Sequence, residues 1–217
     1  MAERGRLDKT GLLLESLAPY RSRTRERLHP LTLADSALMV IDMQRYFLDE
    51  GSHAFLDGAS EVKDNAKRLV ELYRRESLPI VFTRHALKDD DEAGIMDTWW
   101  GGTISDGDPT AEIVDELKPL ENEHVIRKTR YSAFIDTDLE DYLASKGVRR
   151  LVVTGVVTHL CCESTAREAF MRDFEVFFVV DATSSGDDDL HLSSLRCLTD
   201  GFAIPVTTEE VVQRAKR

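Results

Sequence analysis

The sequence predicts an α/β protein in which helices cover both faces of a six-stranded, mostly parallel sheet, a three-layer α/β/α arrangement of the Rossmann-like type. Short apolar runs of strand length alternate along the chain with segments of helical period. The runs are continuously apolar, as expected of strands that are buried on both faces. Strands that alternate with helices favour parallel pairing, because each crossover helix packs back onto the sheet. A chain of 217 residues has the size of one such domain.

The elements follow one another in a regular order. The first 34 residues carry arginines at positions 21, 23, 25 and 27 and predict an irregular N-terminal arm ahead of a domain at 35–217. That arm either packs on the surface of its own domain or embraces a neighbouring subunit. Strands are predicted at 37–41, 79–83, 124–128, 151–156, 175–182 and 204–207. Helices are predicted at 61–75, at 137–147, just after Cys162, at 187–200 and from Thr207 onward.

Two segments between these elements have signals of their own. Thr137 and Glu140 have the spacing of a capping box, which predicts the start of a helix. Residues 86–110 form a long polar stretch that includes KDDDE and the pair Trp99–Trp100. A loop of that length inside a compact domain is usually functional or a lid. KDDDE itself predicts a solvated loop.

The composition excludes several classes of function. With a formal net charge of −12, the protein is a poor match for nucleic acid or an anionic membrane surface. No GxGxxG or P-loop pattern follows a strand, so dinucleotide binding and NTP hydrolysis have no support in the sequence. No cofactor is predicted. Three cysteines, two of them adjacent, make a poor disulfide framework. Reduced thiols, together with the lack of a secretory apolar core, predict a cytoplasmic protein. The predicted partner is a small-molecule substrate.

Three reactive side chains fall at the predicted strand ends. Asp42 ends the first strand, Lys128 ends the third, and Cys161 follows the fourth at the start of a helix. Ligands of open α/β sheets bind at the carboxyl ends of the strands, so these groups should converge. The helix N-terminus and the Lys128 ammonium would favour a Cys161 thiolate, and Asp42 could shuttle its proton. Each residue alone is more often structural, so the prediction rests on the coincidence of all three.

The two adjacent thiols are not equivalent in this interpretation. Cys161 comes first and lies closest to the N–H groups of the turn, which could receive an oxyanion. Cys162 is rotated about 100° around the helix and should face the sheet. Cys197 is expected in the core. A Cys161–Cys162 disulfide would be strained.

The motifs ALMVIDMQRYF, VIRKTRYSAF and VTGVVTHLCCESTAREAFMRDFEVFFVVDATSS resemble those of the isochorismatase-like hydrolase superfamily. The resemblance covers residues from about Ala37 to Val212 and implies the isochorismatase-like hydrolase fold. It places an Asp–Lys–Cys triad at Asp42, Lys128 and Cys161. It also implies a non-proline cis peptide bond at Val156–Val157, with an oxyanion site formed around Val156, Val157, Thr158 and Leu160.

The resemblance leaves the reaction open. MQRYF, KTRYSAF and AFMRDFEVFFVVDA are similar to the isochorismatase branch, whose members convert isochorismate to 2,3-dihydroxy-2,3-dihydrobenzoate and pyruvate. Those enzymes carry glycine in place of Cys161, whereas the THLC pattern resembles thiol-dependent amidases. The leading hypothesis is therefore a cysteine hydrolase that cleaves a C–N bond of a small amide or ureide through a thioester. Isochorismate hydrolysis and a non-catalytic binding subunit are the alternatives.

Metal and partners also follow from the resemblance. The nicotinamidase branch binds a metal through an Asp-x-His…His cluster, but this chain offers only Asp49 and His53, so no required metal is predicted. The superfamily suggests a homodimer or homotetramer.

Eight residues flank the motifs and are candidate substrate contacts. Arg84 and His85 follow the second strand and are expected to meet an anionic substrate group. His159 is predicted to be structural. The remaining candidates, which could line a pocket, are Gln44, Phe47, Trp99, Trp100, Tyr131 and Phe134.

Overall fold

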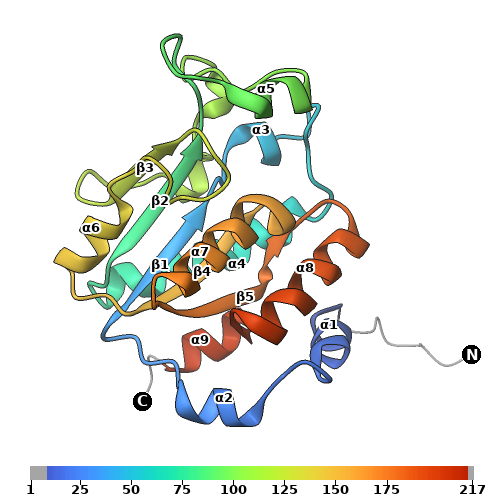
Figure 1. Ribbon diagram of the computed structural model, residues 1–217, viewed down its shortest axis with the longest axis vertical. Coiled ribbons are helices and arrows are strands. Elements are labelled where there is room, and N and C mark those ends of the chain that lie inside the picture. The colour runs from blue at the N-terminus through green and yellow to red at the C-terminus, as the bar shows by residue number, and fades with distance from the viewer. Residues whose placement is uncertain (1–8, 215–217) are drawn as a thin grey trace, which may run out of the picture.

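A computed structural model describes residues 9–214 as one six-stranded sheet with helices on both faces (Figure 1). The strand order is β3-β2-β1-β4-β5-β6, and every neighbouring pair is parallel. The predicted fold class is thus confirmed, and the sheet is parallel throughout rather than mostly so. The strands are β1 (Ser36–Ile41), β2 (Ile80–His85), β3 (His124–Lys128), β4 (Arg150–Val156), β5 (Glu175–Ser184) and β6 (Ile204–Val206).

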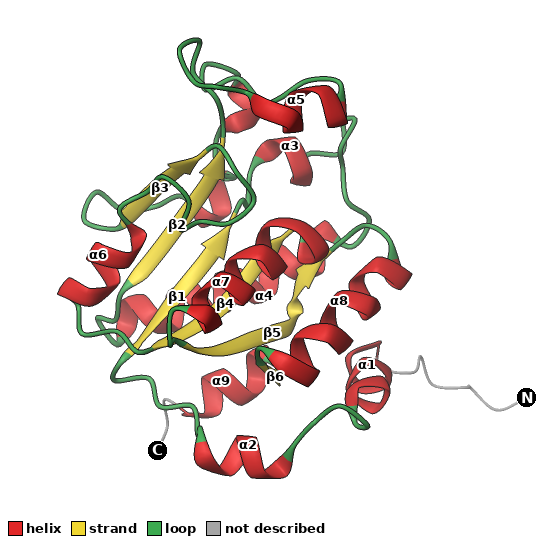
Figure 2. Ribbon diagram, viewed as in Figure 1, coloured by secondary structure: helices red, strands yellow, loops and turns green. Residues whose placement is uncertain are grey.

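The sheet lies between two layers of helices (Figure 2). Alternate residues of β1 divide the core: Leu38 and Val40 belong to one apolar cluster, Met39 and Ile41 to the other. The first cluster includes α4 (Ala59–Arg75) and α9 (Thr208–Arg214). The second includes α6 (Leu139–Ser145), α7 (Glu163–Met171) and α8 (Asp188–Gly201). Burial on both faces explains why the strands read as continuous apolar runs.

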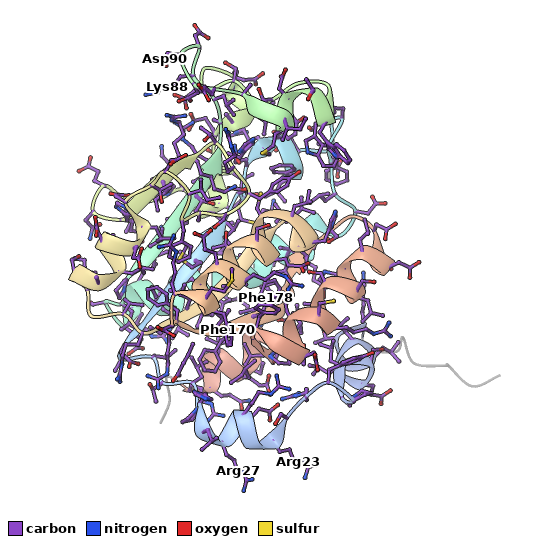
Figure 3. All side chains as sticks on the ribbon, viewed as in Figure 1. Arg23, Arg27, Lys88, Asp90, Phe170 and Phe178 are labelled. Carbon is purple, nitrogen blue, oxygen red and sulfur yellow. The ribbon has the colours of Figure 1, made fainter. Side chains whose placement is uncertain are left out.

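The N-terminal segment is more regular than predicted. It forms α1 (Lys9–Leu17) and α2 (Arg23–Leu28), so the expectation of an irregular arm is wrong for the described residues from 9 to 34. Leu13, Leu14 and Leu17 form the apolar face of α1 that packs on the second cluster, and Leu17 is fully buried there. An Arg25 guanidinium N–H donates to the Thr199 carbonyl at 3.1 Å, tying α2 to α8 of the same chain. Arg23 and Arg27 of α2 point away from the body of the molecule (Figure 3).

The long polar stretch is also partly ordered. It contains α5 (Gly94–Trp100) and a 3-10 turn at Pro109–Ala111, followed by another at Asp115–Leu117. Figure 1 places α5, together with α3 (Arg45–Leu48), beyond the carboxyl ends of β1–β3. Lys88 and Asp90 lie at the tip of this region, in agreement with a solvated KDDDE loop (Figure 3). α5 therefore stands over the edge of the sheet where ligands bind in this class of fold.

A capping box forms at the start of the last helix, but the one predicted at Thr137–Glu140 does not. At the last helix, the Thr207 N–H donates to Glu210 Oε2 at 2.8 Å and the Glu210 N–H donates to Thr207 Oγ1 at 3.1 Å, a complete capping box. The capping box predicted at Thr137–Glu140 does not form. There the helix begins after Asp138, and Glu140 pairs with Arg172 instead. Within residues 9–214, no helix has both the length and the apolar character needed to cross a bilayer.

Candidate active site

The predicted triad residues meet at the carboxyl edge of the sheet. Lys128 Nζ lies 2.8 Å from Asp42 Oδ2 and 3.2 Å from Cys161 Sγ. Lys128 Nζ also donates to the Arg130 carbonyl at 3.0 Å. β1, which is followed by Asp42, lies between β2 and β4, where the chain order along the sheet changes direction. Such a switch point is where ligands bind in open α/β sheets.

Thr83 holds the Asp42 carboxylate in place. The Thr83 hydroxyl donates to Asp42 Oδ1 at 2.6 Å, and the Asp42 N–H donates to the Thr83 carbonyl at 3.1 Å. Both residues are fully buried, so one carboxylate oxygen is oriented by Thr83 and the other faces Lys128. Sequence reasoning missed Thr83. Thr83 is the last residue of the predicted second strand, at the same edge of the sheet as Asp42. That position could have identified it.

The charges around Cys161 differ from the expectation of a thiolate. Burial, and then the Asp42 carboxylate, raise the pKa of the Cys161 thiol to about 12, and the nearby Lys128 ammonium offsets only part of this increase. The free thiol is therefore protonated at neutral pH. Burial alone would lower the pKa of Lys128, but the Asp42 carboxylate first, and then the contact with Cys161, outweigh burial and raise it, so Lys128 stays an ammonium. Asp42 is the adjacent acceptor for the thiol proton.

Only one of the adjacent thiols can be reached. Cys161 and Cys162 lie in a π-helical turn, Thr158–Cys162, that leads into α7. Cys161 retains an exposed fraction of 7% and contacts Lys128, whereas Cys162 is 0% exposed. Burial raises the pKa of Cys162 well above its usual value. Cys197 is exposed on α8, so its expected core position is wrong. The face of α8 that enters the core is formed by Leu195 and Leu198.

The turn before Cys161 offers backbone N–H groups. The peptide bond between Val156 and Val157 is cis, at the position that the family resemblance implies. The N–H groups of Val157, Thr158 and His159 find no hydrogen-bond acceptor within residues 9–214. The Leu160 N–H donates to the Val157 carbonyl at 3.1 Å, so it is not free to bind an oxyanion as predicted. Free N–H groups beside a nucleophile are the usual means of stabilising an oxyanion.

Side chains from α8 and from the residue that follows β5 hold this turn. His191 Nδ1 lies 2.9 Å from Thr158 Oγ1, and His159 Nδ1 lies 2.9 Å from Ser185 Oγ. His159 is therefore placed in a structural role, as the sequence suggested.

Several candidate pocket residues have structural partners instead. The Gln44 side chain donates to the carbonyls of His85 at 3.0 Å and Ala111 at 2.8 Å, and it accepts from the His85 N–H at 2.8 Å. Phe134 is buried in the core beneath the Arg172 guanidinium, which lies 5.1 Å from its ring centre. Phe47 packs edge-to-face on Tyr46. The expected contact of Arg84 with an anionic substrate group has a competitor, because Arg84 pairs with Asp106 at 2.7 Å.

The other candidates lie nearer the carboxyl edge. The adjacent tryptophans are both exposed, Trp99 by 75% and Trp100 by 56%. Trp100 Nε1 donates to the Tyr131 hydroxyl at 2.7 Å, which joins α5 to the segment after β3. His85 is buried next to Lys128. Of the possible metal ligands, Asp49 lies 3.8 Å from Arg45 and His53 lies 2.8 Å from the Tyr46 hydroxyl.

Comparison with known proteins places this geometry in a family. The isochorismatase domain matches residues 36–210. The chain belongs to the isochorismatase family. It is 37% identical to nicotinamidase 3 of Arabidopsis thaliana over 90% of this chain and 94% of that protein. It is 32% identical to the isochorismatase of Bacillus subtilis over 82% of this chain, but the match spans only 57% of that protein.

Comparison with solved structures supports the family assignment. The cysteine hydrolase from Pseudomonas syringae pv. phaseolicola superposes with a TM-score of 0.83 at 25% identity, over 87% of this chain and 95% of that one. This member of the isochorismatase family is therefore a hydrolase with the isochorismatase-like fold. A hydrolase assignment replaces the alternative of a non-catalytic binding subunit.

Proposed function

We propose that this hydrolase cleaves the C–N bond of a small amide through a thioester on Cys161. The observation that carries the proposal is the 3.2 Å contact of Cys161 Sγ with Lys128 Nζ, which itself lies 2.8 Å from Asp42. A thiol, a base and an ammonium in contact are the parts that nucleophilic acyl transfer needs. The 37% identity to a nicotinamidase supports a neutral amide, such as nicotinamide, as the substrate class.

The proposed reaction begins with a protonated thiol. Asp42 accepts the proton as Cys161 Sγ attacks the amide carbonyl carbon, and the N–H groups of Val157 and Thr158 receive the oxyanion. When the tetrahedral intermediate collapses, the C–N bond breaks and Asp42 returns the proton to the leaving amine. Asp42 then takes a proton from water, which attacks the thioester carbonyl carbon. The C–S bond breaks, the carboxylic acid is released, and Asp42 returns the proton to the Cys161 thiolate. Throughout, the Lys128 ammonium stabilises the negative charge on its two neighbours.

The test measures ammonia release from nicotinamide and from a panel of small amides and ureides. Cys161→Ala should lower kcat/KM by about a thousandfold or more, because the nucleophile is lost. Cys162→Ala is the matched control, since it alters the adjacent buried thiol and should retain substantial activity. Intact-mass analysis during turnover should reveal an acyl adduct on the wild-type chain. Activity that survives Cys161→Ala but is lost in Cys162→Ala would contradict the assignment.

A second candidate function is isochorismate hydrolysis. The 32% identity to the Bacillus subtilis isochorismatase favours it. Cleavage of the enol ether needs a proton from Asp42 and makes no use of a nucleophilic sulfur. Pyruvate release from isochorismate that survives Cys161→Ala and is lost in Asp42→Ala would support this function over amide hydrolysis.

We further propose that the chain forms a homodimer or homotetramer. A shallow depression of about 710 Å³ lies between α5, the segment after β3, and α7. Three apolar residues at it, Ile95, Met171 and Ile135, are 76%, 70% and 40% exposed. Exposed apolar patches of this kind often mark an interface. Light scattering after gel filtration should give twice or four times the chain mass, and Met171→Lys should lower it; a wild-type monomer would contradict the proposal.

We also propose that the protein works in the cytoplasm, because Cys161, Cys162 and Cys197 are all free and a reducing compartment keeps a nucleophilic thiol active. Oxidised glutathione should therefore inactivate the enzyme reversibly, slowly at neutral pH and faster as the pH rises and the thiolate fraction grows, with the inactivating adduct on Cys161. Full activity after prolonged oxidation would remove the reason for this location.

A further inference from the structure

His85 presents an unpaired polar atom next to the triad. It is the last residue of β2 and has an exposed fraction of only 7%. Its ring atom Nδ1 is buried and has no hydrogen-bond partner in the described part of the chain. Buried polar side-chain atoms are nearly always paired with protein or water. An unpaired nitrogen at this depth therefore points to a partner that comes from outside the chain.

The position of His85 follows from the pleat of β2. Side chains two residues apart in a strand point to the same face of the sheet. Thr83, two residues before His85, directs its hydroxyl to the Asp42 carboxylate at 2.6 Å. Val81, two residues earlier again, packs in the same apolar cluster as Cys161. The His85 ring thus lies on the face of the sheet that carries the triad, beyond Thr83 and toward the carboxyl edge.

The neighbours of His85 agree with that placement. In the sheet register His85 pairs with Lys128, and its ring is close enough to Asp42, Lys128 and Arg130 to be affected by their charges. Arg84 lies on the opposite face, where it pairs with Asp106. The sequence predicts that Arg84 and His85 both meet an anionic substrate group. Their side chains lie on opposite faces of the sheet, and Arg84 already has a carboxylate partner in Asp106.

The backbone of His85 is fixed by Gln44. Both the N–H and the carbonyl of His85 are hydrogen-bonded to this one buried side chain, at 2.8 Å and 3.0 Å. Gln44 is in turn bonded to the Ala111 carbonyl at 2.8 Å. A residue clamped in this way is presented by a rigid strand rather than a loop, which is what substrate positioning requires.

The imidazole of His85 is neutral at physiological pH. Burial first, and then the Lys128 ammonium, lower the pKa of His85 to about 4, although the Asp42 carboxylate and the Lys128 backbone act in the opposite direction. The Lys128 backbone is close enough to influence the ring, but it forms no hydrogen bond of good geometry with Nδ1. A neutral imidazole cannot form an ion pair with a carboxylate, but it can donate or accept one hydrogen bond with an uncharged group.

We infer that Nδ1 of His85 hydrogen-bonds an uncharged polar group of the substrate and so holds a neutral amide beside Cys161. With Nδ1 as the acceptor nitrogen, His85 acts as a specificity residue that favours the amide, whose N–H can donate to it, over the carboxylate product, which has no donor. The inference rests on the proposed amide hydrolysis and adds to it the residue that recognises the substrate.

Three substitutions separate the two ring nitrogens. His85→Asn keeps a polar atom near the Nδ1 position, His85→Gln moves that atom toward the Nε2 position, and His85→Ala removes it. With nicotinamide as the probe, KM should rise about tenfold or more for His85→Ala and His85→Gln, as expected for the loss of one buried hydrogen bond of about 1.4 kcal/mol. His85→Asn should stay within about threefold of the wild-type KM. The kcat of all three variants should change much less than KM.

The matched control is His124→Asn, which replaces a histidine at the amino end of the neighbouring strand β3. His124 stacks on Tyr142 at 4.1 Å between ring centres and lies away from the carboxyl edge. Its variant should leave KM unchanged. Melting temperatures of all four variants show whether any of them alters folding.

The outcomes distinguish this inference from the proposed function. If the wild type hydrolyses nicotinamide, Cys161→Ala does not, and all three His85 variants keep the wild-type KM, then this inference alone is overturned. If kcat falls equally in all three His85 variants and their melting temperatures are lower, His85 has a structural role, and the inference is also overturned. If the wild type hydrolyses no amide in the panel, the proposed function is wrong and this inference is lost with it.

Discussion

Gly155 of β4 lies so close to Ile41 of β1 that a Cβ atom added to it would be 2.1 Å from the Ile41 carbonyl oxygen. The contact is with backbone, which cannot move aside as a flexible side chain would. Gly155 also has a φ of 120°, a conformation that other residues rarely adopt. This close approach joins the strand that precedes Asp42 to the strand that leads into the Cys161 turn.

Gly155→Ala should therefore destabilise the protein by at least about 3 kcal/mol, because overpacking and backbone strain add at one position. Urea unfolding followed by circular dichroism measures the loss. Gly201→Ala is the control, since a Cβ there meets nothing within 4 Å. It lies in α8 and should change the free energy of unfolding by about 1 kcal/mol or less, in the stabilising direction. Similar stabilities for the two variants would contradict the argument.

Asp42→Asn should separate hydrolysis from thiol reactivity. After burial, the Asp42 carboxylate is the next cause of the raised pKa of Cys161, so a neutral amide in its place should lower that pKa from about 12. Alkylation of Cys161 by iodoacetamide at pH 8–9 should become faster than in the wild type, while turnover is lost because the base is missing. The rates are measured in a Cys162→Ala, Cys197→Ala background, so that only Cys161 reacts. Slower alkylation in Asp42→Asn would mean that the carboxylate activates the resting thiol.

Thr83→Val should lower kcat about tenfold and leave KM nearly unchanged. Valine has the shape of threonine but cannot donate to Asp42 Oδ1, so the carboxylate loses its 2.6 Å hydrogen bond and its fixed orientation. Thr154→Val is a matched control, because that fully buried hydroxyl also makes a 2.6 Å hydrogen bond but donates to the Ala182 carbonyl. Both variants should lose similar stability, and only Thr83→Val should lose activity. An equal fall in kcat for both would assign Thr83 a purely structural role.

Trp100→Phe should raise KM about threefold to tenfold. The substitution keeps an aromatic ring but removes the N–H that donates to the Tyr131 hydroxyl at 2.7 Å, so α5 is held less firmly over the carboxyl edge. Trp99→Phe changes the more exposed neighbour and should have no effect. Initial rates over a range of substrate concentrations give both constants. If Trp99→Phe has the larger effect, α5 acts through its exposed surface rather than through this hydrogen bond.

Local sequence patterns predicted many of the strands and helices correctly. The strand β3 at His124–Lys128 lies where its apolar run predicted, and the helix predicted at 61–75 extends over Ala59–Arg75. The N-terminal helices were missed, because both are short and the arginines of α2 made the segment look irregular. α5 was missed for a similar reason, since it is a short helix with no buried residue inside a glycine-rich stretch.

The sequence by itself determined that Asp42, Lys128 and Cys161 would share one edge of the sheet, because parallel strands bring their carboxyl ends together whatever lies between them. Only the tertiary structure decided what each group does there. The protonated state of Cys161, the neutral state of His85 and the pairing of Arg84 with Asp106 all depend on burial and on charges from distant segments. The periodicity of apolar residues indicates which face of a strand or helix a residue occupies. Which neighbours that residue contacts on that face depends on how the whole chain packs.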